Sequence, residues 1–310
     1  MSAESVINLL RARLANGGRR PFADQARVAL CIEGGAMRGV VSAGMVSALS
    51  DLGYADMFDA VYGSSAGAIS GAYFLAGQAA RGTTVYYEDI NRREFIDFRR
   101  ILLGRPVLNL EFLFDEVAQR RKPLDARRVL QSETPLRIMA TDVETASPVP
   151  LADFETSADL LSALRASSTM PVLAGGPFTH RGRRYLDASL SEPVPVPQAE
   201  ADGYSHLLVL LTRPTEERPG NSAFDRLLVV PRLRRISPAL ADRYANRSQP
   251  YAALNRTIRA GTGPAGRAHA LALRPRTAEV DRLERRRSIL EAGAAEGRRV
   301  VIEAFRAAQS

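Results

Sequence analysis

The sequence has few of the residues that build disulfides, metal centres or membrane spans. Its 310 residues include one cysteine, Cys31, so no disulfide can form within the chain, which fits a reducing compartment. The three histidines form no cluster with cysteine or carboxylates at metal-ligand spacing, so we expect no metal and no cofactor. No run of about 18 apolar residues occurs, and the N-terminal segment lacks the apolar core of a signal peptide. These absences favour a cytoplasmic protein without a membrane-spanning helix.

Lysine is also nearly absent, although the chain is basic. It has 42 Lys and Arg against 34 Asp and Glu, and only Lys122 is a lysine, which indicates a coding bias rather than a binding code. From Arg213 to the end, twenty arginines stand against ten acidic residues. Solvated helix faces explain such a surplus, and peripheral association with an anionic membrane is the functional alternative. Few aromatic residues are interleaved with these arginines, so we expect no nucleic-acid partner.

Short apolar runs alternate with helical patterns, which predicts an α/β fold. Buried strands are expected at residues 26–35, 59–63, 135–144, 206–212 and 269–275, with a proline-rich edge strand at 147–153 and a hairpin at 178–189. Helices are expected at 4–14, 38–53, 66–77, 156–168 and 296–308; Gly53 and either Thr156 or Ser157 are the expected caps. Residues 83–128 look helical and partly exposed, and 213–265 irregular. We therefore expect three layers, α/β/α, around a largely parallel sheet.

Small residues crowd around one serine, Ser65, between a predicted strand and a predicted helix. The segment Gly63-Ser64-Ser65-Ala66-Gly67 has the spacing G-x-S-x-G. In this context a sharp turn exposes the serine hydroxyl, and side chains two residues to either side would collide with neighbouring elements. The N-terminus of the following helix favours negative charge at the same point. Ser65 is therefore a candidate nucleophile and Gly63 and Gly67 form its elbow, with an ordinary tight turn as the alternative.

A second glycine-rich turn, IEGGAMRG at Ile32–Gly39, also joins a strand to a helix. Bare backbone there can aim N–H groups at a developing oxyanion. The turn also partly matches a dinucleotide phosphate loop, but Ala36 occupies the third position of G-x-G-x-x-G, where that motif needs glycine. Arg38 either braces the loop or meets a phosphate-bearing substrate, or it is a surface residue. Glu33 is expected to be structural.

An aspartate, Asp187, follows an apolar pair in the segment YLDAS. A strand end can hold such a carboxylate rigidly, and a simple turn aspartate is the alternative. With this third segment the sequence resembles the patatin-like phospholipase family, and its bacterial members in particular. GGAMRG, then GSSAG about thirty residues on, then ASSTMPVLAGGPF leading to YLDAS follow the family's order over about Val28–Thr212. Two positions depart from it: Ala36 replaces the usual third glycine, and Ala188 follows the aspartate where glycine is commoner.

The resemblance implies a catalytic dyad of Ser65 and Asp187, without a histidine. An exposed aspartate has a pKa of about 4, so Asp187 must be partly desolvated to act as a base at neutral pH. The resemblance also implies an acyl-enzyme intermediate and an oxyanion hole in the glycine-rich loop, formed by Gly34, Gly35, Ala36, Arg38 and Gly39. The expected activity is hydrolysis of carboxylic esters of lipids.

Several alternatives stay open at this point. An acyltransferase would use the same dyad, and a non-catalytic nucleotide- or phosphate-binding module would use the glycine-rich loop. A Ser–Asp–His triad would need His206 or His269, because in the α/β-hydrolase order the histidine comes last. An acyl pocket, or ordinary core, is expected from Met170, Pro171, Val172, Leu173 and Phe178.

No linker divides the chain clearly. We expect an N-terminal helical extension at 1–26, a patatin-like catalytic domain at 27–212, and an arginine-rich helical region at 213–310 that completes the same fold.

Overall fold

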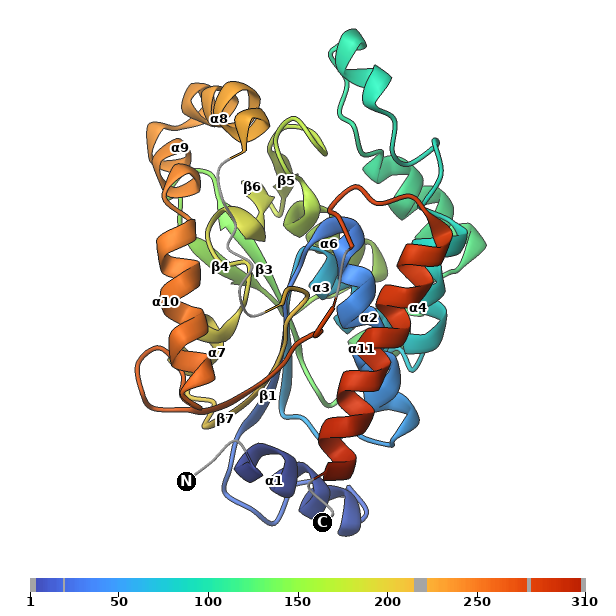
Figure 1. The fold of residues 1–310 in the computed structure, drawn as a ribbon, viewed down its shortest axis with the longest axis vertical. Coiled ribbons are helices and arrows are strands. Elements are labelled where there is room, and N and C mark those ends of the chain that lie inside the picture. The colour runs from blue at the N-terminus through green and yellow to red at the C-terminus, as the bar shows by residue number, and fades with distance from the viewer. Residues whose placement is uncertain (1–3, 19, 215–221, 278–279, 308–310) are drawn as a thin grey trace.

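A mostly parallel β-sheet forms the middle of the molecule, with helices on both of its faces (Figure 1). The computed structural model describes residues 4–18, 20–214, 222–277 and 280–307. Over these residues the strand order is β5-β6-β3-β2-β1-β7-β8, and β4 pairs with β3. The strands are β1 Val28–Ile32, β2 Ala60–Ser64, β3 Leu136–Asp142, β4 Pro148–Leu151, β5 Phe178–His180, β6 Arg183–Asp187, β7 His206–Leu210 and β8 His269–Leu273. The expected three-layer architecture is confirmed.

The sheet is parallel at its centre and antiparallel at one side. β3, β2, β1, β7 and β8 run parallel, whereas β4 and β6 both run antiparallel to β3, and β5 runs antiparallel to β6. The proline-rich β4 pairs with β3 alone, as its two prolines predict, because proline cannot donate to a second neighbour. β5 and β6 form the expected hairpin, and β6 ends at Asp187.

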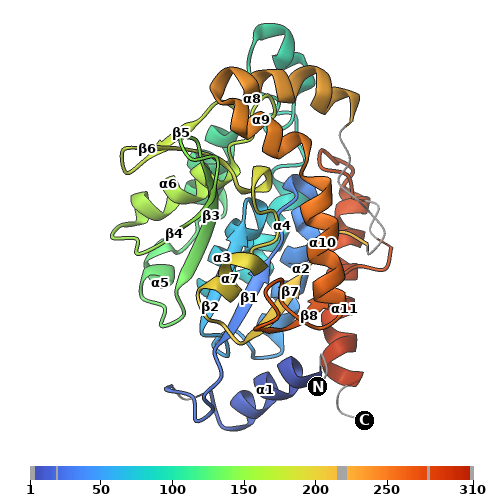
Figure 2. The same cartoon turned by 90° about the vertical axis from the view of Figure 1, so that its left-hand side faces the viewer.

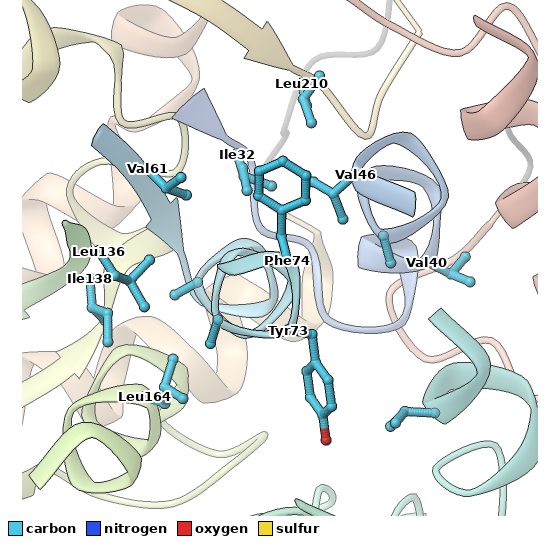
Figure 3. Packing of buried hydrophobic residues seen from close by; sticks show 14 of the residues in the cluster. Ile32, Val40, Val46, Val61, Tyr73, Phe74, Leu136, Ile138, Leu164 and Leu210 are labelled. Carbon is cyan, nitrogen blue, oxygen red and sulfur yellow. The ribbon is translucent and has the colours of Figure 1, made fainter. Parts of the chain in front are cut away.

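Alternate residues of the central strands face opposite sides of the sheet, and each side has its own core. Leu30 and Ile32 of β1 belong to a large cluster, which is packed by α2 Val40–Asp51, α3 Ala66–Leu75, α4 Ala79–Glu88, α5 Ala126–Leu130, α6 Ser157–Ser168 and α11 Arg287–Ala307. Phe74 of α3 lies between the strands and α2 in this cluster (Figure 3). Ala29 and Cys31 belong to a smaller cluster under α7 Val196–Ala201 and α10 Ser248–Arg259. The period-two burial along β1 thus explains why helices cover both faces.

Predicted helix ends agree with the structure where a specific residue signals them. Gly53 follows α2 with φ of 83°, and the N–H of Tyr54 donates to the carbonyl of Leu49 at 2.9 Å, which closes the last turn. Thr156 caps α6, and its side chain accepts the N–H of Asp159 at 3.1 Å.

The N-terminal helix α1 Glu4–Ala15 lies in the expected N-terminal helical extension, and one of its faces is buried. Val6 and Leu10 are fully buried. Arg13 is also buried and makes ion pairs with Asp24 at 2.8 Å and Asp59 at 2.9 Å. These contacts fix the helix at the end of the molecule where the parallel strands begin (Figure 2).

Two regions expected to be helical or irregular have mixed structure. Residues 83–128 contain α4 and α5 together with the 3₁₀ helix η2 Phe98–Leu103 and the π-helix η3 Phe112–Arg121. Residues 213–265 contain the π-helix η5 Asp225–Val229 and three regular helices, α8 Val230–Ile236, α9 Pro238–Ala245 and α10; residues 215–221 lie outside the described residues. Two further short 3₁₀ helices are η1 Ala36–Gly39 and η4 Ala188–Leu190. Within the described ranges no helix has the length and apolar character needed to cross a membrane.

Candidate active site

Ser65 forms the whole connection between β2 and α3. β2 ends at Ser64 and α3 begins at Ala66. Ser65 has φ of 53° and ψ of −122°, a conformation that residues with a side chain rarely adopt. This is the sharp strand-to-helix turn that the G-x-S-x-G spacing predicts.

The two glycines of the turn have no room for a side chain. A Cβ atom at Gly63 would lie 2.4 Å from the Cα of Ala68, and one at Gly67 would lie 2.3 Å from the carbonyl oxygen of Ile32. Both contacts are with backbone, which cannot move aside without shifting the start of α3 or the end of β1. The glycines therefore allow the tight approach of helix to strand that holds Ser65 in place.

Asp187 lies directly beside Ser65, although 122 positions separate the two residues in the sequence. Ser65 Oγ donates a hydrogen bond of 2.8 Å to Asp187 Oδ2. The sheet explains this proximity: β4 occupies one edge of β3, and β2 and β6 share the other edge, end to end. On that shared edge Ser64 pairs with Met139, and Asp187 pairs with the next residue, Ala140. The serine and the carboxylate thus meet where the ends of β2 and β6 come together on one edge of β3, as the sequence predicts.

Burial changes the acid–base character of Asp187. The residue is only 5% exposed, and desolvation raises the pKa of its carboxyl above the ordinary value. Hydrogen bonds from Ser189 and Ser65 oppose that rise; the Ser189 N–H donates to Oδ1 at 2.8 Å. The carboxylate is therefore more basic than an exposed aspartate and is held by both of its oxygens.

Ser167 supports the turn from α6, and the residue-by-residue interpretation of the sequence missed it. The N–H of Ser65 donates to Ser167 Oγ at 2.9 Å, and Ser167 Oγ donates to the carbonyl of Met139. Ser167 is fully buried. It lies within the stretch ASSTMPVLAGGPF, but two adjacent serines and a threonine give no local pattern that distinguishes it.

The glycine-rich loop passes directly over Ser65. A Cβ atom at Gly34 would lie 2.4 Å from the carbonyl oxygen of Ser64 and 3.1 Å from Ser65 Cβ. The N–H of Gly34 donates to the carbonyl of Pro193 at 3.4 Å. Within the described ranges, the backbone N–H groups of Gly35 and Ala36 have no hydrogen-bond acceptor. Two backbone donors next to the serine are therefore available to a ligand.

Arg38 and Gly39 brace this loop, and Arg38 also lines the cavity beside Ser65. Arg38 is buried, and its Nε donates to the carbonyl of Val280 at 2.9 Å. A Cβ atom at Gly39 would lie 2.7 Å from the Cβ of Ala66 and 2.7 Å from the hydroxyl of Tyr86. Gly39 therefore allows the loop to pack closely against α3 and α4.

Glu33 has the structural role that the sequence predicts. Its carboxylate accepts hydrogen bonds from the N–H of Thr212 at 2.6 Å and from the hydroxyl of Tyr251 at 2.8 Å. Thr212 Oγ1 also donates to the carbonyl of Gly34 at 3.1 Å. Glu33 thus ties the loop to the end of β7 and to α10.

The histidines lie away from Ser65. His206 and His269 are the first residues of the parallel strands β7 and β8, and their rings are 5.1 Å apart. Ser65 follows the carboxyl end of β2, which is the opposite end of the sheet. His180 is buried on β5, where it contacts Ser162 at 3.1 Å. The geometry therefore excludes a Ser–Asp–His triad.

Comparison with known proteins identifies the family. The family model for patatin-like phospholipase matches residues 30–200, more than half of the chain. The chain belongs to the patatin-like phospholipase family.

The uncharacterized protein YjjU of Escherichia coli (strain K12) is 30% identical over 200 residues, which are 64% of this chain and 55% of that protein. The chain thus spans about half the length of that relative. VipD from Legionella pneumophila is similar over 54% of this chain and 46% of its own, at 11% identity and a TM-score of 0.31. Membership of this family supports a lipid hydrolase activity in general terms.

The structure accommodates the two departures from the usual patatin-like pattern differently. Ala36 has φ of 51°, in the left-handed region that glycine adopts without cost, so its methyl group strains the loop. Ala188 is fully buried at the start of η4, and φ at this position is not positive.

A cavity of about 360 Å³ opens beside the Ser65–Asp187 pair. One wall is mainly apolar and is contributed largely by α3, α4 and residues 90–113. It includes Ile69, Val85, Ile90, Phe95, Leu113 and Met170. Of the expected pocket residues, Met170 and Leu173 line the cavity, whereas Pro171, Val172 and Phe178 do not line it. The polar part of the lining includes Arg213, Asp225, Arg247 and Arg282. An apolar chain with a polar end therefore fits this cavity.

Proposed function

We propose that this protein hydrolyses carboxylic esters of lipids through a dyad of Ser65 and Asp187. The observation that carries the proposal is the 2.8 Å hydrogen bond between Ser65 Oγ and Asp187 Oδ2 at the wall of a largely apolar cavity. A serine is a weak nucleophile until an adjacent base accepts its proton. Asp187 is that base, and burial gives it the higher proton affinity that the step needs.

The reaction proceeds in two steps. In the first, Ser65 Oγ attacks the ester carbonyl carbon while its proton passes to Asp187. The tetrahedral intermediate then collapses, the C–O bond to the alcohol breaks, and Asp187 returns the proton to the leaving alcohol. In the second step a water molecule attacks the acyl-enzyme, Asp187 accepts a proton from that water, and Ser65 regains its hydroxyl as the fatty acid leaves.

Backbone groups stabilise the oxyanion in both steps. The N–H groups of Gly35 and Ala36 are available beside the serine, and the N-terminus of α3 adds a favourable electrostatic field. Arg38 contributes by holding the loop through its bond to Val280, and Gly34 and Gly39 contribute by letting the loop pack closely.

The decisive experiment labels the protein with a fluorophosphonate probe and measures hydrolysis of a panel of phospholipids, lysophospholipids and neutral-lipid esters. Wild type should be labelled and active, and Ser65→Ala should be neither. Asp187→Asn should lose roughly a thousandfold in kcat/KM, the usual contribution of a positioned base. His206→Ala is the matched control and should retain full activity.

The same experiment distinguishes the remaining alternatives. Labelling of Ser65 with transfer to an added alcohol in preference to water would indicate an acyltransferase. Tight nucleotide binding without any labelling would contradict the hydrolase and indicate a binding module that uses the glycine-rich loop.

A further inference from the structure

Exposed apolar side chains gather on two separate segments of the chain. η2 exposes Phe98, Leu102 and Leu103, at 53%, 87% and 73%, and η5 exposes Leu227 and Leu228, at 73% and 41%. Single exposed leucines are ordinary on a protein surface, but clusters of them indicate an interaction site. Of the large apolar side chains exposed in the described ranges, only Leu52 lies outside these two segments.

Both segments lie at the same end of the molecule. In Figures 1 and 2 the teal segment that contains η2 projects at the top, as does the region of α8, which directly follows η5; α1 lies at the bottom. Leu52, at the end of α2, lies near α1, because the adjacent Gly53 approaches the side chain of Leu14. The apolar side chains are thus concentrated at one end of the fold.

Both segments begin or end at residues that line the cavity. An antiparallel bridge between Ile96 and Leu108 closes the base of the η2 loop, and the N–H of Asp97 donates to the carbonyl of Val107 at 3.0 Å. Leu108, at this base, lines the cavity, and so does Asp225, the first residue of η5. The exposed leucines therefore project from two segments that are each joined directly to the lining of the Ser65 cavity.

Positive charge surrounds both apolar tips. Residues 92–105 contain five arginines and two acidic residues. Around η5 and α8, exposed arginines stand at Arg226, Arg232, Arg234 and Arg235, while the nearby Asp225 is buried and paired with Arg247 at 3.0 Å. Arginine side chains can place their apolar stems beside leucine and keep the guanidinium at a polar interface.

We propose that η2 and η5 dock this protein on an anionic lipid bilayer, with the cavity entrance facing the membrane. Leucine and phenylalanine enter the boundary between headgroups and acyl chains, and the surrounding arginines contact lipid phosphates. The arginines complement the charge of an anionic bilayer, and both segments are joined to residues that line the Ser65 cavity. These two observations favour a bilayer over a protein partner. The inference rests on the proposed lipid hydrolase and adds the surface through which that enzyme reaches its substrate.

The test measures binding of the full chain to vesicles of phosphatidylcholine with and without phosphatidylglycerol. Leu102→Gln/Leu103→Gln and Leu227→Gln/Leu228→Gln should each weaken binding to anionic vesicles by about tenfold. Leu52→Gln is the matched control and should bind like wild type. Added salt should weaken wild-type binding, because it screens the arginines.

Two further measurements separate docking from catalysis. Ser65→Ala should bind vesicles as tightly as wild type, so that membrane docking can be scored even if the proposed chemistry fails. Both leucine pairs should leave hydrolysis of a soluble monomeric ester unchanged and lower hydrolysis of vesicle lipid. Equal vesicle binding by wild type and both double variants would overturn the proposal. It would also be overturned if the double variants converted a wild-type dimer into a monomer without affecting vesicle binding.

Discussion

At the scale of single residues, the pH dependence of activity follows from the burial of Asp187. Only the carboxylate form can accept the proton of Ser65, and desolvation raises the pKa of this group. We therefore expect kcat/KM on a soluble ester to be constant at high pH and to fall as the pH drops through that raised pKa. A pH–rate profile of the wild type measures this; an acid limb no higher than that of an exposed aspartate, about 4, would contradict it.

The same burial predicts that protein stability falls with rising pH, whereas activity rises with it. Because the folded-state pKa is raised, the stability that Asp187 contributes is complete below its unfolded pKa and is lost as the pH rises through the folded value. Asp187→Asn removes the cost of the buried charge. The variant should therefore unfold at a higher temperature than wild type at neutral pH, and the difference should shrink in acid. Thermal unfolding of wild type and Asp187→Asn at neutral and acidic pH measures this difference. Ser65→Ala is the control, and the same pH-dependent difference in that variant would contradict the prediction.

Ala36 offers a second prediction at the scale of one residue. Its φ of 51° costs about 1–2 kcal/mol with a methyl group present, and glycine removes this cost while adding roughly 0.4–1 kcal/mol of unfolded-state entropy. Ala36→Gly should therefore raise the free energy of unfolding by about 0.5 kcal/mol. Ala80→Gly, an exposed helical position, should lower it by a similar or larger amount. Denaturant unfolding of both variants measures the difference, and equal losses would contradict the strain at Ala36.

At the scale of elements, the elbow depends on how closely α3 approaches β1. A Cβ atom at Gly67 would meet the carbonyl oxygen of Ile32 at 2.3 Å, so Gly67→Ala must displace backbone. We expect the variant to lose about 3 kcal/mol or more of stability and its reactivity with a fluorophosphonate probe. Gly176 is the control, because it has open space around it and no positive φ, and Gly176→Ala should be neutral. A fully stable Gly67→Ala would mean that the turn tolerates a side chain.

Elements with a strong local signal were the ones that the sequence predicted well. The buried runs of β1, β2, β3 and β7 have the length and composition of core strands, and Gly53 and Thr156 mark helix ends by known capping chemistry. The pairing of Ser65 with Asp187 was predicted from segment order and resemblance. Composition alone does not reveal it, because it depends on the register that places the ends of β2 and β6 beside consecutive residues on one edge of β3.

Features that depend on distant packing were not predicted. Ser167 supports Ser65 only because α6 lies across β3, and a serine in a serine-rich helix end has no distinctive local pattern. The inner face of α1 is buried through Val6 and Leu10, although its sequence is that of a surface amphipathic helix. The apolar wall of the cavity comes mostly from helices that precede Met170, not from the predicted stretch around it. Such contacts are set by tertiary arrangement and not by local propensity.

At the scale of the whole molecule, the segment after Thr212 is built into the structure that holds the site. β8 extends the sheet by pairing with β7 from His206↔His269 onward. α11 packs on α2 so closely that a Cβ atom at Gly297 would lie 2.1 Å from the carbonyl oxygen of Val41. Tyr251 of α10 binds Glu33 beside the glycine-rich loop. The C-terminal region therefore adds a strand to the sheet, packs a helix on α2 and supports the glycine-rich loop through Glu33.

These contacts predict that residues 1–212 cannot fold alone, although the family model matches residues 30–200. Removal of residues 213–310 would expose one edge of β7 and the face of α2 that α11 covers, and would leave Glu33 without Tyr251. Unpaired edges and large apolar faces favour aggregation over a native state. We expect the truncated chain to show no cooperative thermal transition and no labelling of Ser65, whereas the full chain shows both. A truncated protein that unfolds cooperatively and still reacts would instead make residues 27–212 an independent domain, with the arginine-rich region as an accessory to it.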